Sequence, residues 1–202
     1  KTEEGMDWSA LFKTINDIII EIDTHFPYKV IAVPHAEGDD VIAVLAKNFQ
    51  EKSIIISSDK DFSQLHKYKH IKQYSPIQKK MLSTSNPYKY LQEHIIRGDK
   101  GDGVPNILSD DDCMVQGVRQ KPITKKKLAV WMEQTDMANG LSVNWKRNRQ
   151  LIDFDYIPEE ISKGIMDSYS KKKDDNKQGQ LLNYFIENRL KYLMENIEDF
   201  IR

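Results

Sequence analysis

The stretch SIIISSDKDFSQL, residues 53–65, decides the fold. Its three consecutive isoleucines, residues 54–56, predict a short buried strand. Two serines follow, and then Asp59 and Asp61 flank Lys60. Unpaired charge at the mouth of a buried strand is costly. The two aspartates are therefore candidates for a function that requires carboxylates.

Hydrophobic periodicity on either side of this strand predicts further strands and helices. Strands are expected at residues 30–33, 53–57 and 71–74, the last paired with 80–82 in a hairpin, and helices at 8–26, 40–49, 62–66 and 88–97. Such alternation is typical of an α/β fold with a parallel, doubly wound sheet.

After Gly98 the pattern changes and no clear strand follows. Helices are expected at residues 124–134, 144–151, 159–169 and 181–197, with a polar loop at 170–180. We therefore expect an α/β core over residues 1–98 and a mainly helical region over residues 99–202.

The amino-acid composition indicates the general class of protein. The 202 residues are 39% hydrophobic and 30% charged, which is typical of a folded, water-soluble chain. No apolar run approaches the roughly 20 residues needed to cross a bilayer. The single cysteine, Cys113, has no intramolecular disulfide partner. These features predict a cytoplasmic protein without membrane association, and nothing in them requires more than a monomer.

Three acidic groups lie near the ends of the predicted elements. Glu37, Asp39 and Asp40 follow the first strand, Asp59 and Asp61 follow the second, and Asp99 and Asp102 lie in RGDKGDGVP. Parallel strands bring their carboxyl ends to one edge, where ligands bind. Carboxylates brought together repel unless cations neutralise them, and Mg²⁺ prefers oxygen ligands. The sequence predicts a site for two Mg²⁺ ions, replaceable by Mn²⁺, that would act on a phosphodiester.

The remaining charge is basic. Of 31 acidic residues, 24 remain outside these groups, against 30 basic ones. A basic surface favours binding to nucleic acid. Lys60 and Lys100 lie between the aspartates and are predicted phosphate contacts, as are Lys125 and Lys126 in a lysine cluster.

Other interpretations stay open at this point. Each acidic group alone is also explained by a helix cap or a turn. The pair Asp59 and Asp61 also fits a phosphatase with an aspartate nucleophile. His66 and His70 have the spacing of a zinc pair, but a helix end is expected between them and surface positions are the simpler interpretation.

The order AEGDD, SSDKDFSQL, RGDKGDGVP resembles the 5′-nuclease family, which includes flap endonucleases and the 5′→3′ exonuclease domains of bacterial DNA polymerases. LIDFDYIP and LLNYFIENRL further resemble the branch of T-even bacteriophages, which has RNase H activity. The resemblance implies ligands for a first metal at Glu37, Asp39 and Asp59 and for a second at Asp61 and Asp102. It implies outer ligands, acting through water, at Asp40 and Asp99.

The resemblance also implies substrates and partners. The substrates are duplex, flap or RNA–DNA hybrid nucleic acid, with removal of RNA primers from lagging-strand fragments. The expected protein partners are a single-stranded-DNA-binding protein and a sliding clamp. The family's opening strand, with further metal ligands, and its arch would precede Lys1, so a non-catalytic DNA-binding fragment is the alternative. The acids at 110–112 depart from the family pattern and would repel phosphate.

Overall fold

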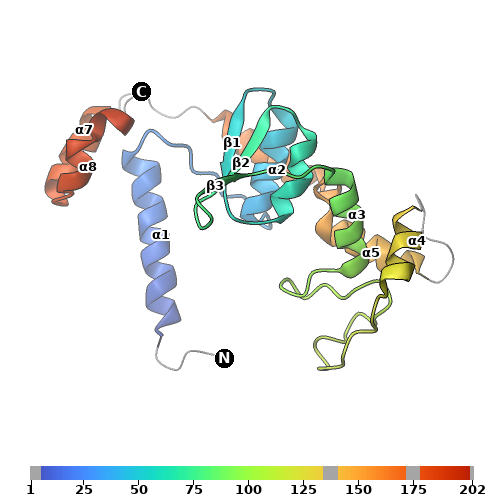
Figure 1. The fold of residues 1–202 in the computed structure, drawn as a ribbon. Helices are drawn as coiled ribbons and strands as arrows, with labels where there is room; N and C mark the ends of the chain where they lie inside the picture. Colours follow the sequence, from blue (N-terminus) through green and yellow to red (C-terminus); the bar gives the residue numbers. More distant parts are fainter. Residues whose placement is uncertain (1–5, 134–140, 172–177, 201–202) are drawn as a thin grey trace. The chain divides into compact units, whose positions relative to one another are not determined.

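The structure is a computed structural model that describes residues 6–133, 141–171 and 178–200 (Figure 1). Its elements, in chain order, are α1 (Trp8–His25), α2 (Gly38–Asn48), β1 (Ser53–Ile56), the 3₁₀ helix η1 (Asp61–Lys67), β2 (Ile71–Ser75), β3 (Lys80–Leu82), α3 (Pro87–Arg97), α4 (Lys125–Met132), α5 (Ser142–Ile152), η2 (Phe154–Tyr156), α6 (Glu159–Ser170), α7 (Gln178–Glu187), α8 (Lys191–Glu195) and η4 (Ile197–Phe200). Most of the predicted polar loop at 170–180 lies outside the described residues.

The chain divides into two compact units. One comprises residues 1–32 and 167–202, and the other comprises residues 33–166. The predicted boundary at residue 98 falls inside the second unit. No helix in the described parts of the chain is long and apolar enough to span a bilayer.

The sheet belongs to the second unit. β1 pairs with β2 in parallel, with Ser53 opposite Ile71, and β2 pairs with β3 antiparallel, with Gln73 opposite Leu82. The predicted hairpin and the α/β class are therefore confirmed. Antiparallel strands can be joined by a short turn, whereas the parallel pair needs a crossover, which η1 supplies here.

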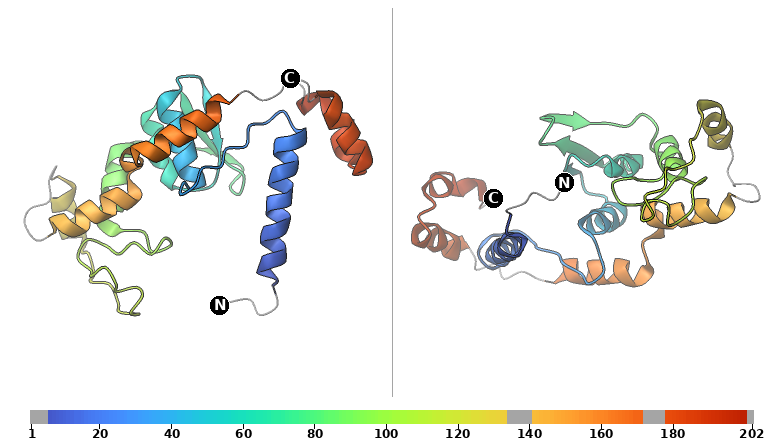
Figure 2. Two further views of the ribbon diagram at one scale, coloured as in Figure 1. Left: turned by 180° about the vertical axis from the view of Figure 1, so that it is seen from behind. Right: turned by 90° about the horizontal axis from the view of Figure 1, so that it is seen from below.

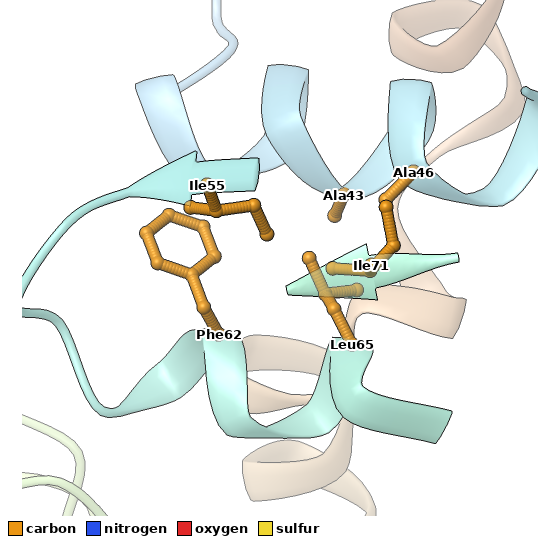
Figure 3. Close-up of a cluster of buried hydrophobic side chains, with 6 residues drawn as sticks. All are labelled: Ala43, Ala46, Ile55, Phe62, Leu65 and Ile71. Atoms are coloured by element: carbon orange, nitrogen blue, oxygen red, sulfur yellow. The ribbon is translucent and has the colours of Figure 1, made fainter. Parts of the chain in front are cut away.

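One face of the sheet holds the core. Ile55 from β1 packs with Ala43 of α2, Phe62 and Leu65 of η1, and Ile71 of β2 (Figure 3). Because side chains alternate along a strand, the neighbours of Ile55 point away from this core, and each is more than half exposed. The isoleucine run is thus buried on one face, and not on both as the sequence predicted.

The predicted strand at residues 30–33 is wrong. These residues form no ladder with β1, and an isolated extended segment is not a strand. Val33 packs instead against α6, where a Cβ added to Gly164 would lie 3.1 Å from Val33 Cγ1. The first acidic group consequently comes from the N-terminus of α2 and does not follow a strand.

α3 leads into the third acidic group. Asn86 caps the helix by accepting from Lys89 N at 2.9 Å, and Pro87 occupies the first turn. The helix ends at Gly98, whose φ is +67°, a conformation that favours glycine. A Cβ there would lie 2.3 Å from Val104 O, so the close return of the chain also requires glycine.

The segment between α3 and α4 has no helix or strand (Figure 1). Hydrogen bonds close its base: Asn106 Nδ2 donates to Lys121 O at 2.9 Å, and Lys121 N donates to Ser109 Oγ at 2.9 Å. Two of the acids at 110–112 are paired, Asp110 with Lys121 and Asp111 with Arg147. The repulsion expected from this acidic run is therefore partly neutralised.

The first unit is helical. The single helix predicted at 181–197 is two helices, α7 and α8, because the chain turns at Arg189, whose φ is +56°. Phe185 is fully buried and meets Phe26 and Phe200 edge-on at 5.7 Å. Tyr184 donates its hydroxyl to Glu21 Oε2 of α1 at 2.7 Å.

Candidate metal centre

The first acidic group forms the start of α2. Glu37 is the N-cap residue, and the Asp40 carboxylate accepts from Glu37 N at 3.0 Å, completing a capping box. Asp39 Oδ1 accepts from Asp40 N at 3.0 Å. Glu37 is exposed, whereas Asp39 and Asp40 are half-buried. Capping thus fixes two of these carboxylates locally and leaves Asp39 facing the other acidic groups.

The second group is held by the neighbouring strand. Asp61 N donates to Asp59 Oδ1 at 2.9 Å. The fully buried amide of Gln73 on β2 donates to Ser57 O at 3.0 Å and to Asp59 O at 2.6 Å. His66 Nε2 bonds with Gln73 Oε1 at 3.1 Å and fixes the orientation of this amide. The loop after β1 is therefore attached to β2 through side chains.

The third group is held within its own turn. Asp99 Oδ1 accepts from Gly101 N at 2.7 Å, and Asp99 Oδ2 lies 3.4 Å from Lys60 Nζ. Asp102 is exposed, and its main-chain N–H lies 3.4 Å from Asp99 Oδ1. Asp99 is buried, so its negative charge requires these partners.

A histidine joins the second and third groups. His94 lies in the last turn of α3 and is 8% exposed. Its Nε2 lies 2.9 Å from Asp99 Oδ2, and its Nδ1 lies 3.4 Å from Asp61 Oδ1. One ligand atom from each of these three residues lies within 4.8 Å of the others. Tyr90, one turn earlier on α3, meets the His94 ring edge-on at 5.8 Å and hydrogen-bonds to Asp61.

The electrostatics reflect this crowding. Burial raises the pKa of Asp61, and the negative charges of Asp59 and Asp99 raise it further, against the opposing effect of His94. Burial also raises the pKa of Asp39, as do Asp40 and Asp59. Carboxylates from three chain segments therefore act on one another.

At Asp99, hydrogen-bonding and charged partners outweigh the effect of burial on the pKa. Burial alone would raise the pKa of Asp99, but the hydrogen bonds from His94 and Gly101 and the charge of Lys60 lower it. Burial and the surrounding aspartates raise the pKa of Tyr90, so its hydroxyl stays protonated as a donor. The centre thus holds one carboxylate with a lowered pKa, Asp99, and two with raised pKa values, Asp39 and Asp61.

Five of the seven predicted carboxylates act on one another: Asp39, Asp40, Asp59, Asp61 and Asp99. Of the seven, Asp61 and Asp99 form the close group with His94, and the other five lie outside it. The predicted phosphate contacts Lys60, Lys100, Lys125 and Lys126 are all exposed.

The sequence motifs do not predict the polar residues that position the carboxylates. His94 and Tyr90 lie on the helix before RGDKGDGVP, four positions apart, a spacing that places them on one helical face. Gln73 lies among the alternating residues of β2, at a position expected to be apolar. His66 and His70 are not a metal pair: η1 ends between them, and His70 Nε2 bonds to Ala46 O at 3.0 Å.

An α/β core with carboxylates from several chain segments beside a buried histidine is typical of an enzyme, and the group Asp61, His94 and Asp99 could hold a metal ion. Two family models match. The 5′–3′ exonuclease N-terminal resolvase-like domain matches residues 8–95, and the C-terminal part of T4 RNase H matches residues 86–200.

Relatives agree with these matches. The chain is 33% identical to ribonuclease H of Enterobacteria phage T4 over 213 aligned residues, covering 99% of this chain and 70% of that protein. The T5 D15 protein, in a crystal structure with metal ions, matches with a TM-score of 0.56 and 16% identity, covering 80% of this chain and 68% of that one. The chain belongs to the 5′–3′ exonuclease family that includes the phage T4 enzyme, and its class is that of the nucleases.

Proposed function

We propose that this chain is a metal-dependent 5′ nuclease that hydrolyses phosphodiester bonds at the 5′ end of RNA or DNA, in hybrids, duplexes and flaps. The observation that carries this proposal is the meeting of carboxylates from three separate segments, Asp39, the pair Asp59 and Asp61, and Asp99. Membership of the exonuclease family supports the reaction class, and the T5 relative, which was crystallised with metal ions, supports metal use.

The donor set fits divalent metal ions. Asp61 Oδ1 and His94 Nδ1 are buried and have no hydrogen-bond partner in the described residues, and Asp39 is half-buried with a raised pKa. A bound cation would offset the cost of leaving Asp61 Oδ1 and His94 Nδ1 unpaired and the cost of the half-buried charge on Asp39. Asp39, Asp59, Asp61 and Asp99 would hold two Mg²⁺ or Mn²⁺ ions, with the exposed Glu37 and Asp102 and the half-buried Asp40 as further ligands. Bound ions would activate water and stabilise the leaving oxygen.

Lysines would hold the substrate backbone. Lys60 is 68% exposed although it pairs with Asp99, so its ammonium reaches solvent, and Lys100 is exposed as well. Lys125 and Lys126 form the first turn of α4, behind the cap at Thr124. The helix N-terminus attracts anions, and cations placed there are unfavourable unless an anion binds. We therefore propose residues 99–202 as the region that contacts duplex phosphates without reading sequence.

The biological role follows from the resemblance to phage relatives. We propose removal of RNA primers from lagging-strand fragments during phage DNA replication, in the cytoplasm of the host. The expected protein partners are a single-stranded-DNA-binding protein and a sliding clamp, with the chain acting as a monomer.

The test is cleavage of a 5′-labelled DNA flap and a 5′-labelled RNA–DNA hybrid by the chain in Mg²⁺, with EDTA and Asp59→Asn as controls. Asp59→Asn keeps an oxygen that accepts from Asp61 N, so it removes charge while preserving the turn. Short products that disappear in both controls are expected.

Two other results would point elsewhere. Salt-sensitive duplex binding without cleavage would favour a non-catalytic DNA-binding fragment. Hydrolysis of a small phosphomonoester through a covalent intermediate on Asp59 would favour the aspartate-nucleophile phosphatase.

A further inference from the structure

Arg147 on α5 is held in place from the inner side of its guanidinium. Its Nε donates to Asn148 Oδ1 at 2.9 Å, and its Nη2 donates to Pro105 O at 3.0 Å. Only 18% of its side chain is exposed. The guanidinium is therefore fixed by α5 and by the turn that follows Asp102, independently of the group on its outer side.

The outer side of this guanidinium carries a carboxylate. Arg147 Nη1 donates to Asp111 Oδ1, and the side chain of Asp111 is 72% exposed. Asp111 belongs to the segment between α3 and α4, which has no helix or strand. An ion pair with so exposed a member contributes little to stability, so another anion can replace Asp111 at low cost.

A second ion pair repeats this arrangement. Lys121 Nζ lies 3.6 Å from Asp110 Oδ1, and both side chains are mostly exposed. The main chain of Lys121 is fixed separately, because its N–H donates to Ser109 Oγ and its carbonyl accepts from Asn106 Nδ2. Two cations on a fixed main chain are thus occupied by two carboxylates from one acidic run.

Phosphate is the ligand that would compete with these carboxylates. A guanidinium presents its N–H groups in a planar fork that fits carboxylate and phosphate oxygens alike. A nucleic-acid duplex also releases counterions when cations bind its closely spaced phosphates. This release favours the exchange of an exposed protein carboxylate for a phosphate of the duplex.

We propose that Arg147 and Lys121 bind phosphates of the nucleic-acid backbone, and that Asp111 and Asp110 occupy these cations in the free protein until the substrate displaces them. The proposal rests on the proposed nuclease function and adds two phosphate contacts and an internal competitor to it. The acidic run then does more than repel phosphate: it lowers the affinity for weak anions and leaves the two cations to a duplex.

The experiment compares duplex affinities of two matched variants. Fluorescence anisotropy measures binding of a labelled DNA duplex to the whole 202-residue chain in EDTA, which keeps the duplex intact. Asp111→Ala is expected to bind roughly two- to fivefold more tightly than Asp112→Ala. The control removes the same charge from the next position, which is exposed and has no ion pair among the described residues. Equal affinities would show that net charge alone acts and would overturn the proposal.

A double-mutant cycle identifies the cation. Arg147→Gln should weaken duplex binding more in the Asp111→Ala background than in the wild type, because Asp111 no longer occupies the guanidinium. Its effect in the Asp112→Ala background should equal that in the wild type. Lys121→Gln with Asp110→Ala forms a second cycle that does not depend on the folding of the Arg147 variant. Effects that are independent of background in both cycles would contradict the proposal.

Cleavage assays separate this inference from the proposed function. Metal-dependent cleavage with equal duplex affinity for Asp111→Ala and Asp112→Ala would remove the inference and leave the function. Tighter binding by Asp111→Ala without any cleavage would support the phosphate contacts and count against the catalytic activity. If neither the wild type nor any variant binds the duplex, the inference is wrong, and cleavage alone decides the function.

Discussion

The side-chain amide of Asn148 donates to the main-chain carbonyl of Pro105 at 2.8 Å, joining α5 to the turn that follows Asp99. The same amide donates to Ile95 O in α3 at 2.8 Å, and Asn148 is fully buried. α3 and α5 lie side by side (Figure 2). One side chain therefore ties together the helix before the third acidic group and the chain after it.

Replacing Asn148 should destabilise this junction. Asn148→Ala removes two buried hydrogen bonds, leaving Ile95 O without this donor while Pro105 O keeps Arg147 Nη2, and we expect a loss of about 1–3 kcal/mol in the free energy of unfolding. Asn148→Asp should cost more, because a carboxylate would face both carbonyls. Urea denaturation measures both, with Asn144→Ala as the control. Asn144 also donates to two carbonyls but is only half-buried, so a smaller loss is expected. Equal stability of all four proteins would contradict this account.

Alanine substitutions at two glycines should distinguish the cost of backbone strain from the cost of a steric clash. Gly98 and Gly103 both have positive φ, +67° and +75°. A Cβ at Gly98 would lie 2.3 Å from Val104 O, whereas a Cβ at Gly103 meets nothing within 4 Å. Gly103→Ala should cost about 1–2 kcal/mol from conformation alone, and Gly98→Ala distinctly more. Thermal or urea unfolding measures the loss of stability in each variant. Equal losses would show that the chain passes Gly98 less closely than the 2.3 Å separation indicates.

The buried amide of Gln73 should control the position of the Asp59 loop. Gln73→Leu keeps the size of the side chain but removes the donors to Ser57 O and Asp59 O, so we expect a loss of about 1–3 kcal/mol. We also expect metal-dependent cleavage to fall by more than the folded fraction explains, because Asp59 loses its support. Activity per folded molecule equal to that of the wild type would show that the loop holds its geometry without Gln73.

Neutralising Asp39 should stabilise the metal-free protein while removing activity. Its pKa is raised above 3.8 in the folded state, mainly by burial, so its ionised form is disfavoured on folding. In Asp39→Asn, Oδ1 can still accept from Asp40 N. The variant should gain up to about 1 kcal/mol at pH 7.

The stability difference between the wild type and Asp39→Asn should depend on pH in a defined direction. As pH falls through the raised folded pKa, wild-type Asp39 takes up a proton and the difference between the two proteins shrinks. Below the ordinary value of 3.8 it should vanish. Unfolding of both proteins between pH 3 and pH 7, in EDTA, measures it. A stability difference that grows on acidification would refute this explanation.

Lysines at the start of α4 should carry the salt dependence of duplex binding. Each phosphate contact contributes about 0.9 to the slope of log K against log salt concentration. The double change Lys125→Gln and Lys126→Gln should lower this slope by about 2. Lys52→Gln with Lys69→Gln is the control, because these lysines are exposed at the amino ends of β1 and β2, away from the acidic edge. Equal slopes for the two double variants would exclude α4 from the interface.

Local sequence determined most of the elements and the candidate carboxylates. The isoleucine run predicted β1, the hydrophobic spacing predicted α1, α2 and α3, and Gly98 marked the end of α3. These features depend on neighbours in the chain, through periodicity, capping and the conformational freedom of glycine. The order of the acidic motifs was sufficient to indicate the family, which the comparisons establish.

Tertiary structure alone decided which groups meet. The segment 30–33 has strand-like residues but no hydrogen-bonded neighbour, because strand formation depends on a partner elsewhere in the chain. The contacts of Gln73 with the Asp59 loop and of His94 with Asp61 and Asp99 join different elements and follow no local pattern. The sequence therefore determined which carboxylates were available, whereas packing of α3 against η1 determined that a histidine stands between two of them.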